Sequence, residues 1–154
     1  VKVLAIYTAS AAGEPMTAHE SIEAIAGKGL AGDRYAEGRG HWSDYPDRSG
    51  IHVTFIARGV LERVFEAEGI DLFRGEHRRN IVLDGEELRP FFRKDFRLGT
   101  ALFAGIRPCA PCRYLERLTT EGAKKALSQY GGGGLRAEVL ESGVIAVGDE
   151  PQFV

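Results

Sequence analysis

The chain has 154 residues, and its 20 basic and 22 acidic residues give a formal net charge of −2 at pH 7. This balance gives no long-range attraction to nucleic acid or to an anionic membrane surface, so any anion must be bound by a local cluster of charges. Two cysteines are too few for a secreted disulfide framework, residues 1–7 lack the long apolar run and cleavage site expected of a signal segment, and no apolar run approaches membrane-spanning length. We therefore expect one cytoplasmic domain over residues 1–154.

Short segments with apolar and β-branched residues at alternate positions predict β-strands along the chain. The segment 21–26 is less distinct, because its glutamate and alanines would also suit a short helix. Two segments carry apolar residues at helical spacing: 60–65, which ends before Gly69, and 114–130, which Gly122 can interrupt. The predicted strands lie at residues 1–7, 21–26, 51–56, 81–83, 96–106 (one or two strands), 135–140, 144–147 and 152–154.

Closely spaced short strands with two or three helices favour a mixed, β-rich α/β domain built on a curved or closed sheet. A regular alternation of strand and helix is absent, which argues against a doubly wound parallel sheet.

Three loops stand out by composition. Glycines between residues 27 and 32 permit positive φ angles, and Asp33 and Arg34 follow them; a functional loop and an ordinary surface turn are equally compatible with these residues. The polar segment 35–50 has only Trp42 as a large apolar residue, and loops of this length are usually functional or mobile. The glycines at 131–134 indicate a hinge or a surface that another segment approaches closely.

Arg78, Arg79 and Asn80 lead directly into the predicted strand at 81–83. Successive strand residues point to opposite faces, so we expect one arginine to point inward and the other to meet solvent. An inward guanidinium needs an anion, and its planar fork matches phosphate, while Asn80 adds an amide donor and acceptor. The alternative is a solvated run of charges.

Both cysteines, Cys109 and Cys112, lie in a segment that two prolines stiffen and two arginines flank. They can be packing residues, a thioredoxin-like dithiol, or ligands to a metal or cofactor. Too few residues follow Cys112 to complete a thioredoxin fold. A closed zinc site needs four protein ligands, so a cofactor that brings most of its own ligands suits one cysteine better. The histidines, which lack paired spacing, are His19, His41, His52 and His77.

Four segments, in this order, resemble the MOSC domain, the module named for the C-terminal part of molybdenum cofactor sulfurases. They are GLAGDR at 29–34, RRNIV at 78–82, CAPC at 109–112 and GGLRAEVL at 133–140, and Gly143 and Gly148-Asp149 follow. The resemblance extends over nearly the whole chain. It implies a MOSC-like, curved or closed β-barrel with a few peripheral helices, and a molybdenum cofactor (molybdopterin) held in a cleft.

In the reductase members of this family, an arginine and an asparagine in the segment that matches 78–80 hold the pterin and its phosphate, and the metal-binding cysteine matches Cys112. The resemblance thus implies that Cys112 is both catalytic and the metal ligand, with Cys109 as a less essential partner at the cofactor. We expect an anion pocket that faces the cysteine segment. Its residues are Arg78, Arg79 and Asn80, with Arg34 as a fourth contributor.

Three functions remain open at this point. The first is reduction of a small N-hydroxylated substrate with electrons from a donor protein. The second is a sulfur carrier, in which a Cys112 persulfide moves sulfur from a donor such as a pyridoxal phosphate-dependent cysteine desulfurase to a cofactor or metal–sulfur cluster. The third is a non-catalytic dithiol module that senses redox state. Mitochondrial-type reductases carry a further N-terminal β-barrel domain without a counterpart in these 154 residues, so their substrates and partners are not transferred.

Overall fold

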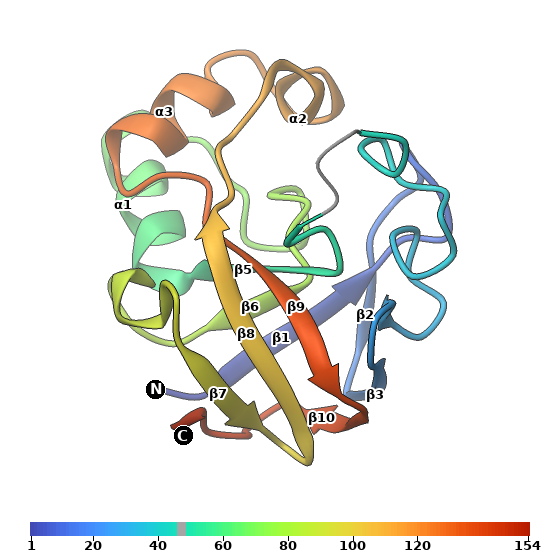
Figure 1. Ribbon diagram of the computed structural model, residues 1–154. Helices are drawn as coiled ribbons and strands as arrows, with labels where there is room; N and C mark the ends of the chain where they lie inside the picture. Colours follow the sequence, from blue (N-terminus) through green and yellow to red (C-terminus); the bar gives the residue numbers. More distant parts are fainter. Residues whose placement is uncertain (46–48) are drawn as a thin grey trace.

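The computed structural model describes residues 1–45 and 49–154, and its main feature is a strongly curled sheet of eight strands (Figure 1). Neighbouring strands are antiparallel except for the fifth and sixth strands of the chain, β5 and β6, which run parallel. The order across the sheet is β11 (Gln152–Phe153), β7 (Asp95–Leu98), β8 (Ala101–Pro108), β9 (Leu135–Glu141), β5 (Val53–Ala57), β6 (Ile81–Leu83), β1 (Val3–Thr8) and β2 (Thr17–His19).

A second, three-stranded sheet has the order β10 (Gly143–Ala146), β3 (Ser21–Ile25) and β4 (Gly29–Leu30). It lies beside the large sheet, with β10 near β8 and β3 near β9. The strand predicted at 21–26 is confirmed, because Ile22 and Ala24 pair with Ile145 and Gly143 of β10. Pairing with a distant strand thus decides between strand and helix in a segment whose own propensities are mixed.

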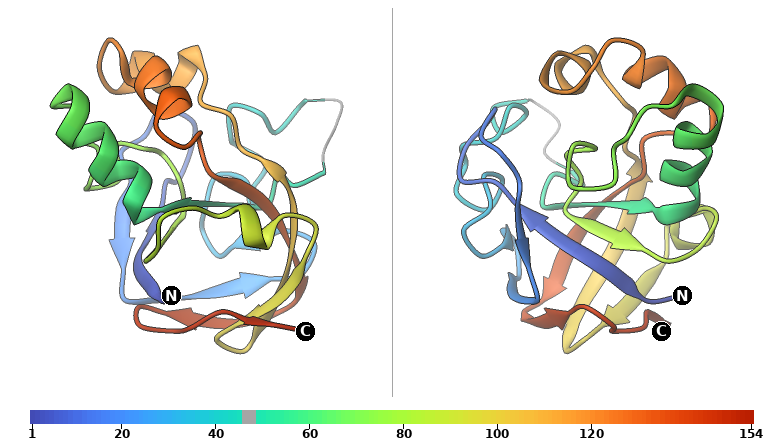
Figure 2. Two further views of the ribbon diagram at one scale, coloured as in Figure 1. Left: turned by 90° about the vertical axis from the view of Figure 1, so that its left-hand side faces the viewer. Right: turned by 180° about the vertical axis from the view of Figure 1, so that it is seen from behind.

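The helices α2 (Arg113–Leu118) and α3 (Ala123–Gln129) lie at one end of the molecule, beyond the end of β8, and α1 (Arg58–Glu68) lies at the flank, against α3 and β5 (Figures 1 and 2). Gly69 ends α1 with a φ of 67°, and Gly122 separates α2 from α3 with a φ of 92°, as the sequence predicts. A short 3₁₀ helix at Arg89–Phe91 and the strands β2 and β4 were not predicted. In the part of the chain that the structure describes, no helix has both the length and the apolar character needed to cross a membrane.

The core fills the inside of the curled sheet. Phe55 contacts Phe96 and Phe103 edge-on, with ring centroids 5.7 and 5.6 Å apart, and all three side chains are fully buried. Burying a side chain of this size contributes about 1.5–3 kcal/mol relative to leaving it in water. This aromatic cluster joins β5, β7 and β8, and β8 leads directly into the cysteine segment.

Candidate functional site

One cavity brings together residues from several distant segments at the helix-bearing end of the molecule. Its empty volume is about 430 Å³, including space that is open to solvent. Of the six residues predicted for the site, all but Asn80 line it. The lining residues are Arg34, Tyr35, Trp42, Thr54, Arg78, Arg79, Cys109, Ala110, Cys112, Tyr114, Leu115 and Arg136.

Arg78 and Arg79 both turn inward, with exposures of 9% and 7%. The expectation that one of them meets solvent is therefore wrong. The reason lies in the backbone: Arg78 has a φ of 63°, in the left-handed region, and the two residues precede β6 rather than belong to it. Strand alternation does not apply across such a turn. A non-glycine residue in this conformation is uncommon and is often found at functional sites.

The guanidinium of Arg78 is only partly satisfied. Its Nη1 donates to the carbonyl oxygen of Glu14, but its Nη2 is buried and has no hydrogen-bond partner among the described residues. Burial lowers the pKa of Arg78, and the neighbouring positive charge of Arg34 lowers it further. A buried cation with an unpartnered donor is unfavourable. An anion in the cavity would satisfy the donor and neutralise the charge.

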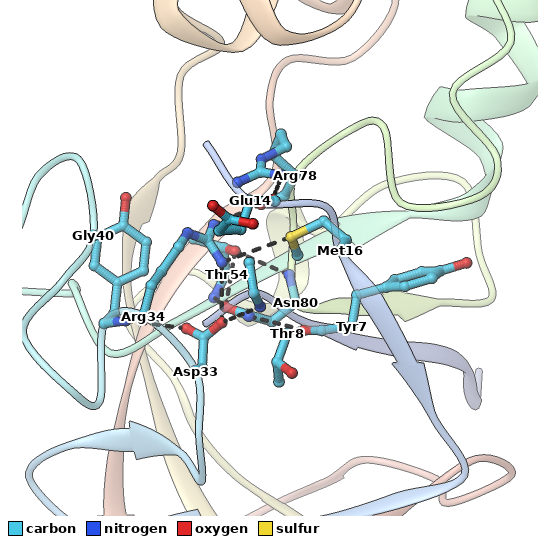
Figure 3. Close-up of polar contacts among 12 residues, drawn as sticks. Tyr7, Thr8, Glu14, Met16, Asp33, Arg34, Gly40, Thr54, Arg78 and Asn80 are labelled. Atoms are coloured by element: carbon cyan, nitrogen blue, oxygen red, sulfur yellow. Dashed lines mark hydrogen bonds and ion pairs between the residues drawn. The ribbon is translucent and has the colours of Figure 1, made fainter. Parts of the chain in front are cut away.

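Arg34 is held rigidly in the same cavity (Figure 3). Its Nη1 donates to Oδ1 of Asp33 at 3.0 Å, and its Nη2 donates to the backbone carbonyl of Arg78 at 3.1 Å. The second bond supports the left-handed turn at Arg78. Asp33 is fully buried and also accepts from the backbone NH of Ala9 at 3.1 Å. The glycine turn therefore serves to place Arg34 in the cavity.

Arg79 holds the cysteine segment in place. Its Nε donates to the carbonyl oxygen of Gly133 at 2.6 Å, and its Nη2 lies 3.5 and 3.4 Å from the carbonyl oxygens of Cys109 and Ala110. The Gly133 backbone touches the same segment, because a Cβ there would lie 2.0 Å from the Cys109 oxygen. The close approach expected at 131–134 is thus confirmed, and Arg79 links the two loops.

Asn80 was expected in the anion pocket, but it bonds to Thr54 and Tyr7 instead (Figure 3). It is fully buried and does not line the cavity. Its Oδ1 accepts from the backbone NH of Thr54 at 3.0 Å and from the Thr54 hydroxyl at 3.2 Å, and its Nδ2 donates to the Tyr7 carbonyl at 3.0 Å. These bonds join β1, β5 and the start of β6. Asn80 therefore positions the backbone beside Arg79, and both the oxygen and the nitrogen of its amide are hydrogen-bonded within the chain.

The two thiols differ in accessibility. Both cysteines are free; Cys109 is 1% exposed, whereas Cys112 is half-buried and directly precedes α2. Among the residues that the structure describes, no group of three or more His, Cys, Asp or Glu side chains could hold a metal ion. A metal in this cavity would therefore take most of its ligands from a bound group, and Cys112 is the accessible sulfur for it.

Four further lining residues were not predicted as site residues: Tyr35, Trp42, Tyr114 and Arg136. Arg136 comes from β9, between the buried residues Leu135 and Ala137. Charged residues alternate with apolar ones along β9, so Arg136 carried no signal that distinguished it. Trp42 stood out only as the large apolar residue of a polar loop, and only the folded chain brings this loop next to the helix that begins beside Tyr114.

An aromatic contact joins these two elements at the mouth of the cavity. The rings of His41 and Tyr114 are stacked, with centroids 3.8 Å apart and planes at 8°. Trp42 meets His41 edge-on at 4.6 Å. Burial lowers the pKa of His41, with a smaller contribution from Arg117. A neutral imidazole stacks on a phenol ring without losing the hydration of a charge.

The family model of the MOSC domain matches residues 49–152, whereas no curated protein matches the chain. Among solved structures, YuaD from Bacillus subtilis is similar, with a TM-score of 0.77 at 14% identity, covering 99% of this chain and 94% of YuaD. YiiM from Geobacillus stearothermophilus gives a TM-score of 0.72 at 17% identity, covering 99% of this chain and 74% of that chain. YiiM from Escherichia coli gives a TM-score of 0.66 at 19% identity, covering 100% of this chain and 70% of that chain.

At these identities the structural likeness shows the fold alone. It confirms the expected β-rich α/β fold, with a strongly curled half-barrel sheet and three helices among the described residues. The family model extends over more than half of the chain and includes the arginine turn, the cysteine segment and β9. The chain therefore belongs to the MOSC domain family.

Proposed function

We propose that this MOSC domain binds the molybdenum cofactor in the arginine-lined cavity and uses Cys112 as the protein ligand to the metal. The observation that carries the proposal is the buried, unpartnered Nη2 of Arg78, in a cavity that Arg34 and Arg136 also line. No acidic side chain is among the described residues that line this cavity. A terminal phosphate would accept charge-assisted hydrogen bonds there, each contributing about 1.5–3 kcal/mol.

The sulfur of Cys112 suits the metal end of such a cofactor. A thiolate is a soft ligand, and soft ligands favour thiophilic metal centres. The segment around it is stiff, because Arg79 and Gly133 fix the Cys109 and Ala110 backbone. A ligand that is already held in place costs less entropy when the metal binds.

We propose reduction of small N-hydroxylated compounds as the reaction. The bound cofactor would supply the two-electron chemistry. The balance is R–NHOH with two electrons and two protons giving R–NH₂ and water, and the electrons would come from an electron-donor protein. In this scheme the arginines bind and orient the phosphate. Trp42 and Tyr114 would shield the cavity from water, and Cys112 would hold the metal.

A second candidate is a sulfur carrier, which the accessibility of Cys112 favours. The Cys112 thiolate would attack the terminal sulfur of a donor persulfide, such as that of a cysteine desulfurase. A new S–S bond would form at Cys112 as the donor S–S bond breaks, and the donor would leave as a thiolate. The redox-sensing dithiol has less support, because Cys109 is only 1% exposed.

Metal analysis separates these functions. Protein produced in a host that makes the cofactor should contain close to one molybdenum per chain and release a fluorescent pterin after oxidation. Arg78→Lys keeps the charge but loses the planar fork, so it should retain measurably less cofactor. It should also lower reduction of an aromatic amidoxime by the loaded protein in the same proportion. Molybdenum-free protein with a persulfide on Cys112 would favour the carrier, and absence of both would contradict both functions.

A further inference from the structure

A second cavity adjoins the first at Cys112. Its empty volume is about 710 Å³, including open space, and it shares four lining residues with the first cavity: Trp42, Ala110, Cys112 and Arg136. Its own residues are Tyr45, Ile51, Arg107, Pro108 and Pro111. The accessible thiol therefore stands between an arginine-rich cavity and a second space with different walls.

The walls of this second cavity are mainly apolar and aromatic. Trp42 and Tyr45 meet edge-on, with centroids 5.6 Å apart and planes at 88°. Trp42 also contacts His41, which is itself stacked on Tyr114, so these ring contacts restrain the indole. Fixed aromatic and proline faces suit a flat ring, which gains stacking energy beyond the burial of its area.

Two positive charges lie in these apolar walls. Arg107 of β8 and Arg136 of β9 are direct cross-strand partners, and both line the cavity. Arg107 donates to the Ser49 hydroxyl at 3.2 Å. For Arg136 the structure gives no hydrogen bond or ion pair within the described residues, and none of the described lining residues is acidic.

We infer that the second cavity is the substrate site and that it selects flat aromatic compounds with an anionic group, such as a carboxylate. The ring packs on Trp42, and the carboxylate meets Arg136 and Arg107. The assignment as a substrate site rests on the proposed function, because Cys112 in the shared wall places the reducible N–O group beside the metal ligand. The preference for an anionic aromatic compound rests only on residues of this chain.

Binding to metal-free protein tests this preference without turnover. Trp42 is the only tryptophan, so its emission reports on the cavity directly. We compare 4-nitrobenzoate with its neutral analogue 4-nitrobenzamide as quenchers, with free tryptophan as the correction for absorbed light. One charge-assisted hydrogen bond predicts that the carboxylate binds about tenfold more tightly or better.

Single substitutions test where the carboxylate of the quencher binds. Arg107→Gln removes a charge that lines only the second cavity, and Arg136→Gln removes the shared one; each should reduce the preference to about threefold or less. Arg97→Gln is the matched control, because Arg97 is a partly exposed arginine that lines neither cavity and pairs with Glu141. It should keep the full preference.

Two results would overturn the inference: equal binding of the two quenchers, or a preference that survives in both variants and disappears in Arg78→Gln. The second result would place the carboxylate in the first cavity. Other results would contradict the proposed function or the substrate class independently of each other. Protein that contains no molybdenum when made in a host that produces the cofactor, but that still prefers the carboxylate, would remove only the reductase assignment. Molybdenum-loaded protein that reduces neutral and carboxylated aromatic amidoximes with equal kcat/KM would remove only the substrate class.

Discussion

Arg78 and Arg79 are adjacent and almost equally buried, yet the structure predicts opposite consequences when each is replaced by asparagine. Arg78→Asn should leave the free energy of unfolding of the metal-free protein within about 1 kcal/mol of the wild-type value, whereas Arg79→Asn should lower it by about 3 kcal/mol. The contrast arises because Arg79 bonds to its own chain, while Arg78 keeps a donor free.

The magnitudes follow from the contacts. At Arg78, the left-handed backbone costs a non-glycine residue about 1–2 kcal/mol, and asparagine tolerates it better. The unpartnered Nη2 costs about 1–3 kcal/mol. Asparagine reduces the backbone cost and removes the unpartnered donor. These gains offset the loss of the bond to the Glu14 carbonyl, which contributes about 1.5–3 kcal/mol. At Arg79, the 2.6 Å bond to Gly133 is lost and buried carbonyl groups lose their donor.

Urea unfolding at pH 7, followed by Trp42 emission, measures both values. Thermal unfolding with and without inorganic phosphate adds a ligand test. Phosphate should raise the Tm of the wild-type protein, because it binds the folded arginine cavity, and should raise that of Arg78→Asn much less. If Arg78→Asn were as destabilising as Arg79→Asn and kept the full response to phosphate, Arg78 would be a structural residue and the anion site would lose its main support.

Three further predictions concern the loops around the site. Gly133→Ala should displace the cysteine segment and speed the reaction of Cys112 with a thiol reagent, while Gly132→Ala, where nothing lies within 4 Å of the added Cβ, should cost only the strain of its φ of 85°, about 1 kcal/mol in urea unfolding. Burial and the neighbouring arginines lower the pKa of His77 from 6.5 to about 3 in the folded state, so the unfolded chain binds more protons below pH 6.5 and stability should fall by up to about 1.4 kcal/mol per pH unit towards pH 4. The His77→Gln variant should lack this contribution to the pH dependence of stability. If urea titrations at pH 7, 6 and 5 gave the same pH dependence for the variant and the wild-type protein, the assignment to His77 would be wrong. Cys112→Ser should abolish molybdenum or sulfur loading, whereas Cys109→Ser should be milder, and equal losses in metal and persulfide assays would instead favour a dithiol mechanism.

Several features of this protein could be predicted from sequence alone, because they depend on local chemistry. Alternating apolar residues identified the long strands, and glycines at 69 and 122 marked helix boundaries that the structure confirms. The spacing of Cys109 and Cys112 and the order of the four short motifs indicated the MOSC family, which the family model confirms. The short strands β2 and β4 escaped prediction, because two or three residues carry too little periodicity.

Only the tertiary structure decided how the side chains of the site are used. Arg78 adopts a left-handed φ that no strand pattern shows, so Arg78 and Arg79 both point inward. The amide of Asn80 bonds to the backbones of β5 and β1, the two strands that flank β6 and that come together only when the sheet forms. Arg136 and Trp42, from segments far apart in sequence, line the same cavities as Cys112. A side chain's direction and partners depend on backbone angles and non-local strand pairing, and neither is encoded in residue spacing.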